Sequence, residues 1–129
     1  MIDLAQHRED YAKFLLDCNT SAEEVQEYTD FPNYKETPIA GLALGPSEIE
    51  GTGVFATQNF GHLTNLGKAL DGETRSMLGR YVNHGRYPNA FFVKQHSGDI
   101  YAITGRDILA GEEITYDYRQ TLWVALHAK

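Results

Sequence analysis

Apolar positions in the first 17 residues recur with the spacing of a helix. Leu4, Tyr11 and Leu15 fall near one stripe of residues 3–17, and Phe14 lies beside it. Such a stripe is typical of an amphipathic helix that packs on a larger body, and Asp3 can cap its start. The pattern therefore predicts a first helix over residues 3–17.

A second short helix is predicted by the pair Ser21 and Glu24. A serine followed three positions later by a glutamate is the spacing of a capping box, which satisfies free N–H groups at a helix start. Pro32 ends the pattern, because the residue before a proline is disfavoured in the helical conformation. We expect this helix to end near Tyr28 and the two helices, about 30 residues, to form a lid or prop on the main domain.

Beyond residue 38 the chain changes to short β-prone runs separated by Gly and Pro turns. The runs cover residues 39–44, 53–57, 78–82, 90–95 and 99–104. His96, Ser97 and Gly98 connect the last two runs, with the length and composition of a hairpin turn. We therefore predict a mainly β (α+β) protein, with an N-terminal helical extension over residues 1–38 and the main domain over residues 39–129.

The pattern does not assign a secondary structure to two segments. Glycines interrupt residues 58–77, where a loop, a short strand at residues 63–66 and a helical turn at residues 73–77 all fit. Residues 119–128 could form a last helical turn or an irregular tail.

The net charge of the chain limits the classes of partner that we expect. The 129 residues carry 11 basic and 18 acidic side chains, a net charge of −7. No basic cluster is present, so we do not expect nucleic acid as the main partner. An acidic surface favours a cationic partner such as a lysine-rich peptide, although it also simply keeps a small protein soluble.

Cysteine and histidine content argue against a metal site and against disulfides. Cys18, the only cysteine, cannot build a disulfide framework or a cysteine-ligated zinc site. The five histidines show no paired ligand spacing, so we expect no metal. Residues 1–20 contain no leader and the chain no long apolar run, so we expect a soluble protein of the cytoplasm or of a host cell, without membrane binding.

Three short motifs can carry chemistry, and the first is a glycine pair. Gly51 and Gly53 flank Thr52 and directly precede a β-prone run. Because glycine has no Cβ, backbone groups there can approach a ligand closely. A plain hairpin turn is the commoner explanation of such a pair.

The second motif, residues 78–89, takes a short apolar strand into a polar turn. The turn presents the Asn83 amide and the His84 imidazole at the end of the strand. Asn, Gly and Pro fix the backbone shape here, and they argue against a regular helix. Taken alone, the motif is also compatible with an ordinary turn whose polar groups are satisfied.

The third motif, residues 111–118, ends in two tyrosines. Tyr116 and Tyr118 fall on the same face of an alternating strand. Two phenols on one face are usually a half-buried aromatic pair. They can also form a slot that holds an alkyl-ammonium group by cation–π contact.

Taken in order, the three motifs resemble those of the SET-domain protein lysine methyltransferases. The family patterns are G-x-G-V/L-F-A, R-F-x-N-H-S-x-x-P-N and G-E-E-L/I-T-x-D-Y, and the matching stretches are residues 51–56, 80–89 and 111–118. The resemblance covers about residues 40–118. The chain looks most like the minimal, stand-alone SET proteins of viruses and phages.

The resemblance implies a β-clip fold with a C-terminal pseudoknot, in which the C-terminal segment threads under the loop that carries the second motif. It implies S-adenosylmethionine as the cofactor and a lysine-containing protein or peptide as the substrate. The cofactor-binding residues that it implies are Gly51, Thr52, Gly53, Val54, Tyr81, Asn83 and His84. Tyr118 matches the family's catalytic tyrosine. Tyr116 matches the position that influences how many methyl groups are added, where a tyrosine goes with monomethylation.

The chain departs from the family at several positions. The stretch between the first two motifs is short, Gly85 stands where the family has Ser, and Tyr87 replaces a common Cys. No cysteine-rich tail follows the third motif, so residues 119–129, through Trp123, or a second subunit of a homodimer would have to close the lysine channel.

Our main hypothesis is an S-adenosylmethionine-dependent protein lysine N-methyltransferase. The alternative is a SET-fold protein that binds S-adenosylmethionine or a partner, or acts on a small molecule, without protein lysine methyltransferase activity. The short middle stretch favours this alternative, and the intact Asn83 and Tyr118 argue against it. A third interpretation is a β-rich interaction module without a cofactor.

Overall fold

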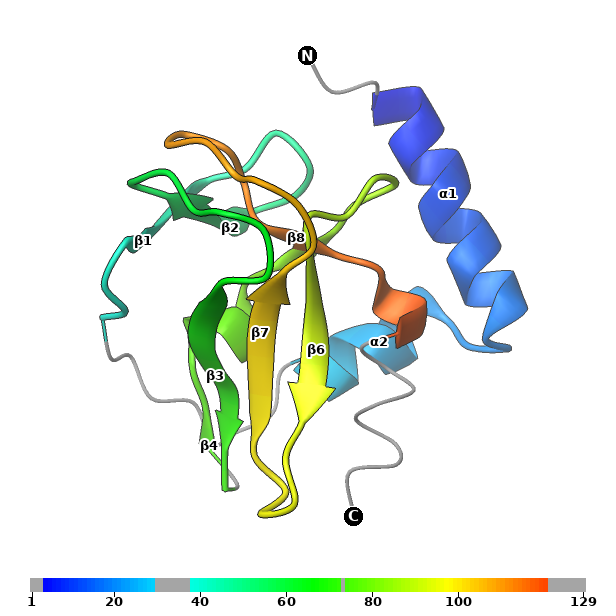
Figure 1. The fold of residues 1–129 in the computed structure, drawn as a ribbon. Coiled ribbons are helices and arrows are strands. Elements are labelled where there is room, and N and C mark those ends of the chain that lie inside the picture. Colours follow the sequence, from blue (N-terminus) through cyan, green and yellow to red (C-terminus); the bar gives the residue numbers. More distant parts are fainter. Residues whose placement is uncertain (1–3, 30–37, 73, 121–129) are drawn as a thin grey trace.

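Two helices precede a body made of short strands (Figure 1). The computed structural model describes residues 4–29, 38–72 and 74–120. Helix α1 spans Leu4–Asp17 and helix α2 spans Ala22–Thr29, which confirms both predicted helices within the described residues. The expected cap Asp3 lies outside those residues.

Ser21 caps the start of α2, as the spacing of Ser21 and Glu24 predicted. The backbone N–H of Glu24 donates to the hydroxyl oxygen of Ser21 over 3.2 Å, and the Ser21 hydroxyl donates to the Glu24 carboxylate over 3.4 Å. The serine thereby satisfies an N–H group that would otherwise lack a partner in the first turn of the helix.

The strands form three sheets among the described residues. In chain order they are β1 (Leu42–Pro46), β2 (Thr52–Ala56), β3 (Asn65–Asp71), β4 (Thr74–Arg75), β5 (Asn83–His84), β6 (Ala90–Lys94), β7 (Ile100–Thr104) and β8 (Thr115–Tyr116). Strands β1 and β2 pair in antiparallel fashion, and the largest sheet has the order β4-β3-β7-β6. Strands β5 and β8 form a two-stranded parallel sheet. The mainly β (α+β) fold class is therefore confirmed.

Local turn chemistry predicted the hairpin of β6 and β7 correctly. The two strands pair from Ala90 opposite Thr104 to Lys94 opposite Ile100. The N–H of Gly98 donates to the carbonyl of Gln95 over 3.0 Å and closes the turn. Gly98 has a φ of +93°, a conformation that favours glycine.

The predicted strand at residues 78–82 is wrong, because the short helix α3 occupies Met77–Arg80. Ser76 caps this helix by accepting a hydrogen bond from the N–H of Leu78 over 3.1 Å. The side chains of Met77 and Leu78 are both buried in the core, so a single helical turn places two consecutive apolar residues inside. Strand β3 is also longer than the strand expected at residues 63–66, and the helical turn expected at residues 73–77 begins only at Met77.

The C-terminal segment lies between two strands that are far from it in sequence. On one side, the N–H of Ile114 donates to the carbonyl of Val54 in β2 over 2.7 Å. On the other side, β8 pairs with β5, with Thr115 opposite Asn83. The implied pseudoknot needs this segment in that position, and the threading itself stays a prediction.

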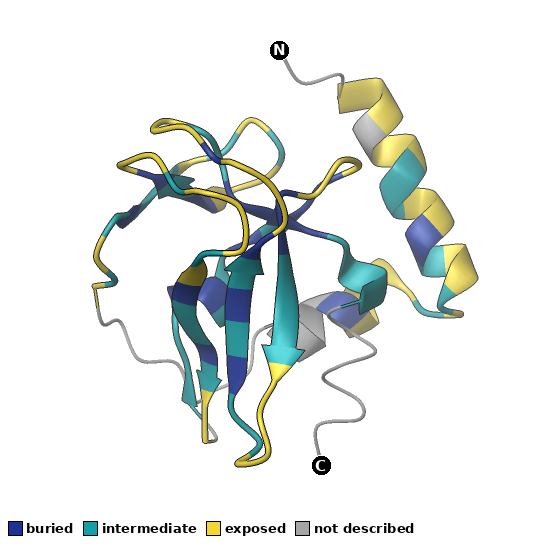
Figure 2. Ribbon diagram, in the orientation of Figure 1, coloured by how far each residue is buried: buried dark blue, intermediate teal, exposed yellow. Residues whose placement is uncertain are grey.

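The core lies beneath these crossings. Figure 2 shows burial concentrated on β7 and on the central crossing of β8, whereas α1 is exposed over most of its surface. Within α1, Phe14 is fully buried, at 0% exposure. The helix therefore packs on the body through one narrow face, and this face contacts His84.

Candidate functional site

The second and third motifs meet in space. The backbone N–H of Tyr118 donates to Nδ1 of His84 over 3.0 Å, and the Tyr118 hydroxyl donates to the carbonyl of Val82 over 2.9 Å. The Tyr116 hydroxyl donates to the carbonyl of Leu78 over 2.8 Å. Both phenols thus point to the same segment of chain, as expected for two residues on one face. The polar turn and the two tyrosines therefore lie together in space.

Both phenols are held in the neutral form. Burial raises the pKa of Tyr116 well above its ordinary value. Burial also raises the pKa of Tyr118, and the nearby Tyr11 and Glu50 add to the effect because a phenolate would be repelled by negative charge. At neutral pH each tyrosine is therefore a hydrogen-bonding group and not a base.

Asn83 links the second motif to the third and to the loop of residues 47–51 that leads into the first. Its side-chain Nδ2 donates to the carbonyl of Glu50 over 3.0 Å, to Oγ of Ser47 over 3.1 Å and to Oε2 of Glu113 over 2.9 Å. The Ser47 hydroxyl in turn donates to the Glu113 carboxylate over 2.7 Å. These bonds hold the loop of residues 47–51 against the β5–β8 pair.

Gly53 is required by this network. A Cβ at Gly53 would lie 2.4 Å from Oε2 of Glu113, which is far too close for any side chain. The glycine is buried, and what approaches it is the carboxylate of Glu113. The absence of a side chain therefore gives the Glu113 carboxylate the room to reach Asn83.

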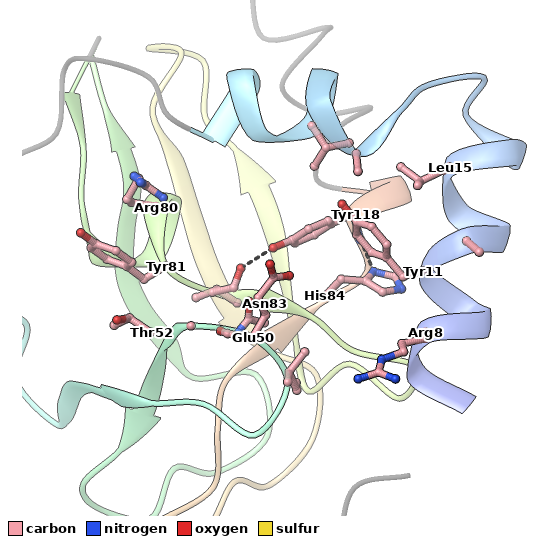
Figure 3. Close-up of a pocket in the computed structure, with 16 residues that line it drawn as sticks. Arg8, Tyr11, Leu15, Glu50, Thr52, Arg80, Tyr81, Asn83, His84 and Tyr118 are labelled. Atoms are coloured by element: carbon pink, nitrogen blue, oxygen red, sulfur yellow. Dashed lines mark hydrogen bonds between the residues drawn. The ribbon is translucent and has the colours of Figure 1, made fainter. Parts of the chain in front are cut away.

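A cavity of about 810 Å³ opens beside the cluster (Figure 3). Six of the residues that the sequence implied for the site line it: Gly51, Thr52, Tyr81, Asn83, His84 and Tyr118. The other three, Gly53, Val54 and Tyr116, are buried and are not among the lining residues. The volume lies in the range of small-molecule and cofactor sites.

Helix α1 forms one wall of the cavity, which the sequence motifs did not indicate. Arg8, Tyr11 and Leu15 project from this helix towards the cavity, as Figure 3 shows. On the side of the body, the lining includes one acidic residue, Glu50, and one basic residue, Arg80. The pattern at the N-terminus predicted a buried stripe, but it carried no signal of which part of the body the stripe would cover.

His84 is held from two sides. The residue is 2% exposed, and its Nε2 contacts Oδ2 of Asp10 in α1. The ring also stacks on Phe14, with centroids 5.5 Å apart and an interplanar angle of 22°. Tyr118 contacts the same Phe14 ring edge to face at 5.7 Å. Helix α1 therefore fixes the imidazole from the side opposite to the tyrosine backbone.

Among residues 4–29, 38–72 and 74–120, no three His, Cys, Asp or Glu side chains gather in a way that could hold a metal ion. In the same part of the chain, no helix has the length and the apolar character needed to cross a membrane.

The SET domain family model matches residues 5–119. A curated relative, the "Histone-lysine N-methyltransferase, H3 lysine-36 specific" of Candida albicans, is 44% identical over 52 residues, which are 38% of this chain and 6% of that protein. The chain thus spans a small part of the length of this relative.

Solved structures show the same fold. A humanized mutant of the Chaetomium thermophilum Polycomb Repressive Complex 2, bound to an inhibitor, matches with a TM-score of 0.52 and 21% identity over 63% of this chain and 15% of that one. The family match begins in α1 and ends at Arg119, so it includes all the residues of the cluster around His84 and Tyr118. The chain therefore belongs to the SET domain family.

Proposed function

We propose that this chain is an S-adenosylmethionine-dependent protein lysine N-methyltransferase that adds a single methyl group. The observation that carries the proposal is the partly buried, neutral phenol of Tyr118, anchored to the carbonyl of Val82 at the wall of a cavity of about 810 Å³. Its family membership and its relative, which is named a histone-lysine methyltransferase, support the same reaction class.

The donor set of the cavity fits the proposed cofactor. Among the described residues no donor reaches Oδ1 of Asn83, so this oxygen can accept a bond from the ammonium group of an amino acid. Glu50 supplies a carboxylate for the same cation, and Arg8 supplies a cation for a carboxylate. The rings of Tyr11 and Tyr81 offer apolar faces for a purine. We assign cofactor binding to Gly51, Thr52, Gly53, Val54, Tyr81, Asn83 and His84, of which Gly53 and Val54 act by shaping the loop and the strand behind the cavity.

The side chain that receives the methyl group must first lose a proton. A lysine amine has a pKa of about 10.4 in water, and its charged form has no lone pair with which to attack. Transfer into a site that excludes water lowers the amine pKa and favours the free amine. When bound, S-adenosylmethionine supplies a methyl group on a positively charged sulfur. The protein therefore has to desolvate the amine and aim its lone pair.

Tyr118 performs the second task in this proposal. Its hydroxyl hydrogen is committed to the carbonyl of Val82, so the phenol oxygen has lone pairs that can accept an N–H of the lysine amine. Because burial keeps the phenol neutral, Tyr118 orients the amine and does not remove its proton. Tyr116 supports it from the core, where its hydroxyl bonds the carbonyl of Leu78 and its ring packs edge to face on Phe92 at 4.6 Å.

Transfer of labelled methyl groups tests the proposal. The purified chain is incubated with S-adenosylmethionine labelled in the methyl group and with a cell lysate, and the protein fraction is analysed for methyl-lysine by mass spectrometry. We expect labelled protein with Tyr87→Phe, a matched control at a tyrosine that is 76% exposed, and at least about a tenfold loss with Tyr118→Phe. Label that appears only in small molecules would contradict transfer to protein.

A further inference from the structure

We propose that Asp10 of helix α1 is a positioning residue for Tyr118 and acts through the ring of His84. The inference rests on the proposed function and adds to it a residue that lies outside all three sequence motifs. Asp10 and His84 are 74 positions apart in the chain, yet Oδ2 of Asp10 contacts Nε2 of the imidazole. Asp10 would thereby set the orientation of the ring to which the backbone of the catalytic tyrosine is bonded.

The hydrogen bonds on the two sides of the ring define its tautomer. A neutral imidazole has one nitrogen that donates and one that accepts. Nδ1 accepts the N–H of Tyr118 over 3.0 Å, so the proton of the ring lies on Nε2 and is donated to the Asp10 carboxylate. Two consecutive hydrogen bonds thus connect a carboxylate on α1 to the backbone of Tyr118.

Because the His84 ring is enclosed, its orientation depends on the hydrogen bond to Asp10. The imidazole side chain is 1% exposed, so its Nε2–H cannot turn to solvent for a replacement partner without leaving its place. A half-turn of the ring about its bond to Cβ would put a carbon where Nδ1 now accepts the Tyr118 N–H. Loss of the Asp10 carboxylate would therefore weaken the hydrogen bond between Nδ1 and the Tyr118 N–H, on the other side of the ring.

A second ion pair on the same helix provides a matched control. Asp17 of α1 bonds Arg119 over 3.2 Å and so ties the helix to the residue that follows Tyr118. Asp17 and Asp10 carry the same charge, and both anchor α1 to the body, but only Asp10 contacts the imidazole. If only the docking of α1 mattered, replacing either aspartate would have the same effect. If the orientation of the His84 ring matters, only replacing Asp10 would have it.

The first test uses magnetic resonance and does not depend on activity. Ring ¹⁵N shifts of His84 and the hydrogen-exchange rate of the Tyr118 amide are measured in the unmodified chain, in Asp10→Ala and in Asp17→Ala. We expect the Nε2–H tautomer in the unmodified chain and in Asp17→Ala. In Asp10→Ala we expect shifted ring nitrogens and at least about tenfold faster exchange of the Tyr118 amide, because the bond to Nδ1 is weakened. Equal changes in both variants, or no change in either, would overturn the proposal.

The second test asks whether the orientation matters for transfer. We expect kcat for lysine methylation to fall about tenfold in Asp10→Ala, with little change in the affinity for S-adenosylmethionine. Asp10→Asn keeps an oxygen that can accept the Nε2–H, so we expect it to restore most of the rate and the slow amide exchange. Unmodified chain that transfers no methyl group at all would contradict the proposed function, while the magnetic resonance result would still decide the role of Asp10.

Discussion

The side-chain nitrogen of Asn83 lies 2.9 Å from Oε2 of Glu113, although 30 positions separate the two residues. This bond joins the second sequence motif to the third. Nδ2 of the same amide also contacts Ser47 and the carbonyl of Glu50, which hold the loop of the first motif. One amide group therefore links the second and third motifs to the loop that leads into the first. Its Nδ2 holds these segments together, and its Oδ1 is the acceptor that we propose for the ligand.

Replacing Asn83 by alanine should weaken cofactor binding more than any nearby change. The substitution removes the acceptor Oδ1 and the Nδ2 donor of the Glu50 carbonyl, and it leaves the Glu113 carboxylate with Ser47 as its remaining donor in this network. A buried group that loses its partner costs about 1–3 kcal/mol, so we expect the affinity for S-adenosylmethionine to fall about tenfold to a hundredfold in calorimetry. Ser47→Ala is the comparison, because it loosens the same loop but keeps Oδ1, and its loss should be smaller. Unchanged affinity in Asn83→Ala would contradict the assignment of the site.

Adding a methyl group at Gly53 should disturb the same network. The added Cβ would lie 2.4 Å from Oε2 of Glu113, a carboxylate held by Ser47 and Asn83. The carboxylate has to move away, and overpacking of this kind costs about 1–3 kcal/mol. We expect Gly53→Ala to lower the free energy of unfolding by about that amount and to weaken cofactor binding.

Gly61→Ala is the matched control for this substitution. A Cβ at Gly61 would lie 3.9 Å from its nearest neighbour, the Thr64 hydroxyl, so we expect little change in stability or binding. Urea denaturation and calorimetry on the two variants give the comparison. Equal stability of Gly53→Ala and Gly61→Ala would show that the Glu113 carboxylate does not need the space.

Local chemistry explains which parts of the fold the sequence could predict. The Ser21 cap and the turn before Asp99 depend on neighbouring residues, so their patterns are visible along the chain. The approach of the second motif to Tyr118 was predictable for a different reason, because three motifs in a known order carry the family geometry with them.

The parts that sequence reasoning missed depend on distant contacts. Helix α3 forms because Ser76 caps it and because the core receives both Met77 and Leu78, and neither condition appears in a β-prone run of apolar residues. The pairing of Asp10 with His84 has no local signature at all, since a buried stripe on a helix does not say which surface it will cover. The cavity wall made by α1 is therefore a result of the structure alone.

The number of methyl groups added should respond to Tyr116. Its hydroxyl bonds the carbonyl of Leu78, and its position matches the family position that goes with monomethylation. Removing the hydroxyl in Tyr116→Phe leaves space and frees that carbonyl, so we expect dimethylated product where the unmodified chain yields monomethylated product. Mass spectrometry of a methylated substrate peptide measures the ratio. Single additions in both forms would contradict a role of Tyr116 in product control.

The phenols of Tyr116 and Tyr118 should make the protein less stable at high pH. Burial raises the pKa of both Tyr116 and Tyr118 above the ordinary 10.0, so in the folded protein they keep their protons where an unfolded chain loses them. The unfolded state then binds fewer protons, and the free energy of unfolding falls as pH rises. The stabilisation is fully present below pH 10.0 and is lost above it, with a slope of about 1.4 kcal/mol per pH unit for each phenol.

Comparing phenylalanine variants isolates this contribution. Urea denaturation followed by circular dichroism is carried out between about pH 9 and pH 11 on the unmodified chain, Tyr118→Phe and the exposed control Tyr87→Phe. At neutral pH we expect Tyr118→Phe to be less stable by about 1 kcal/mol, because it lacks the hydrogen bond to Val82. Above the ordinary phenol pKa its curve should fall less steeply and converge on that of the unmodified chain, while Tyr87→Phe stays parallel. Parallel curves for Tyr118→Phe and the unmodified chain would mean that the Tyr118 phenol ionises freely, and a tyrosine that ionises freely could act as a base instead of orienting the amine.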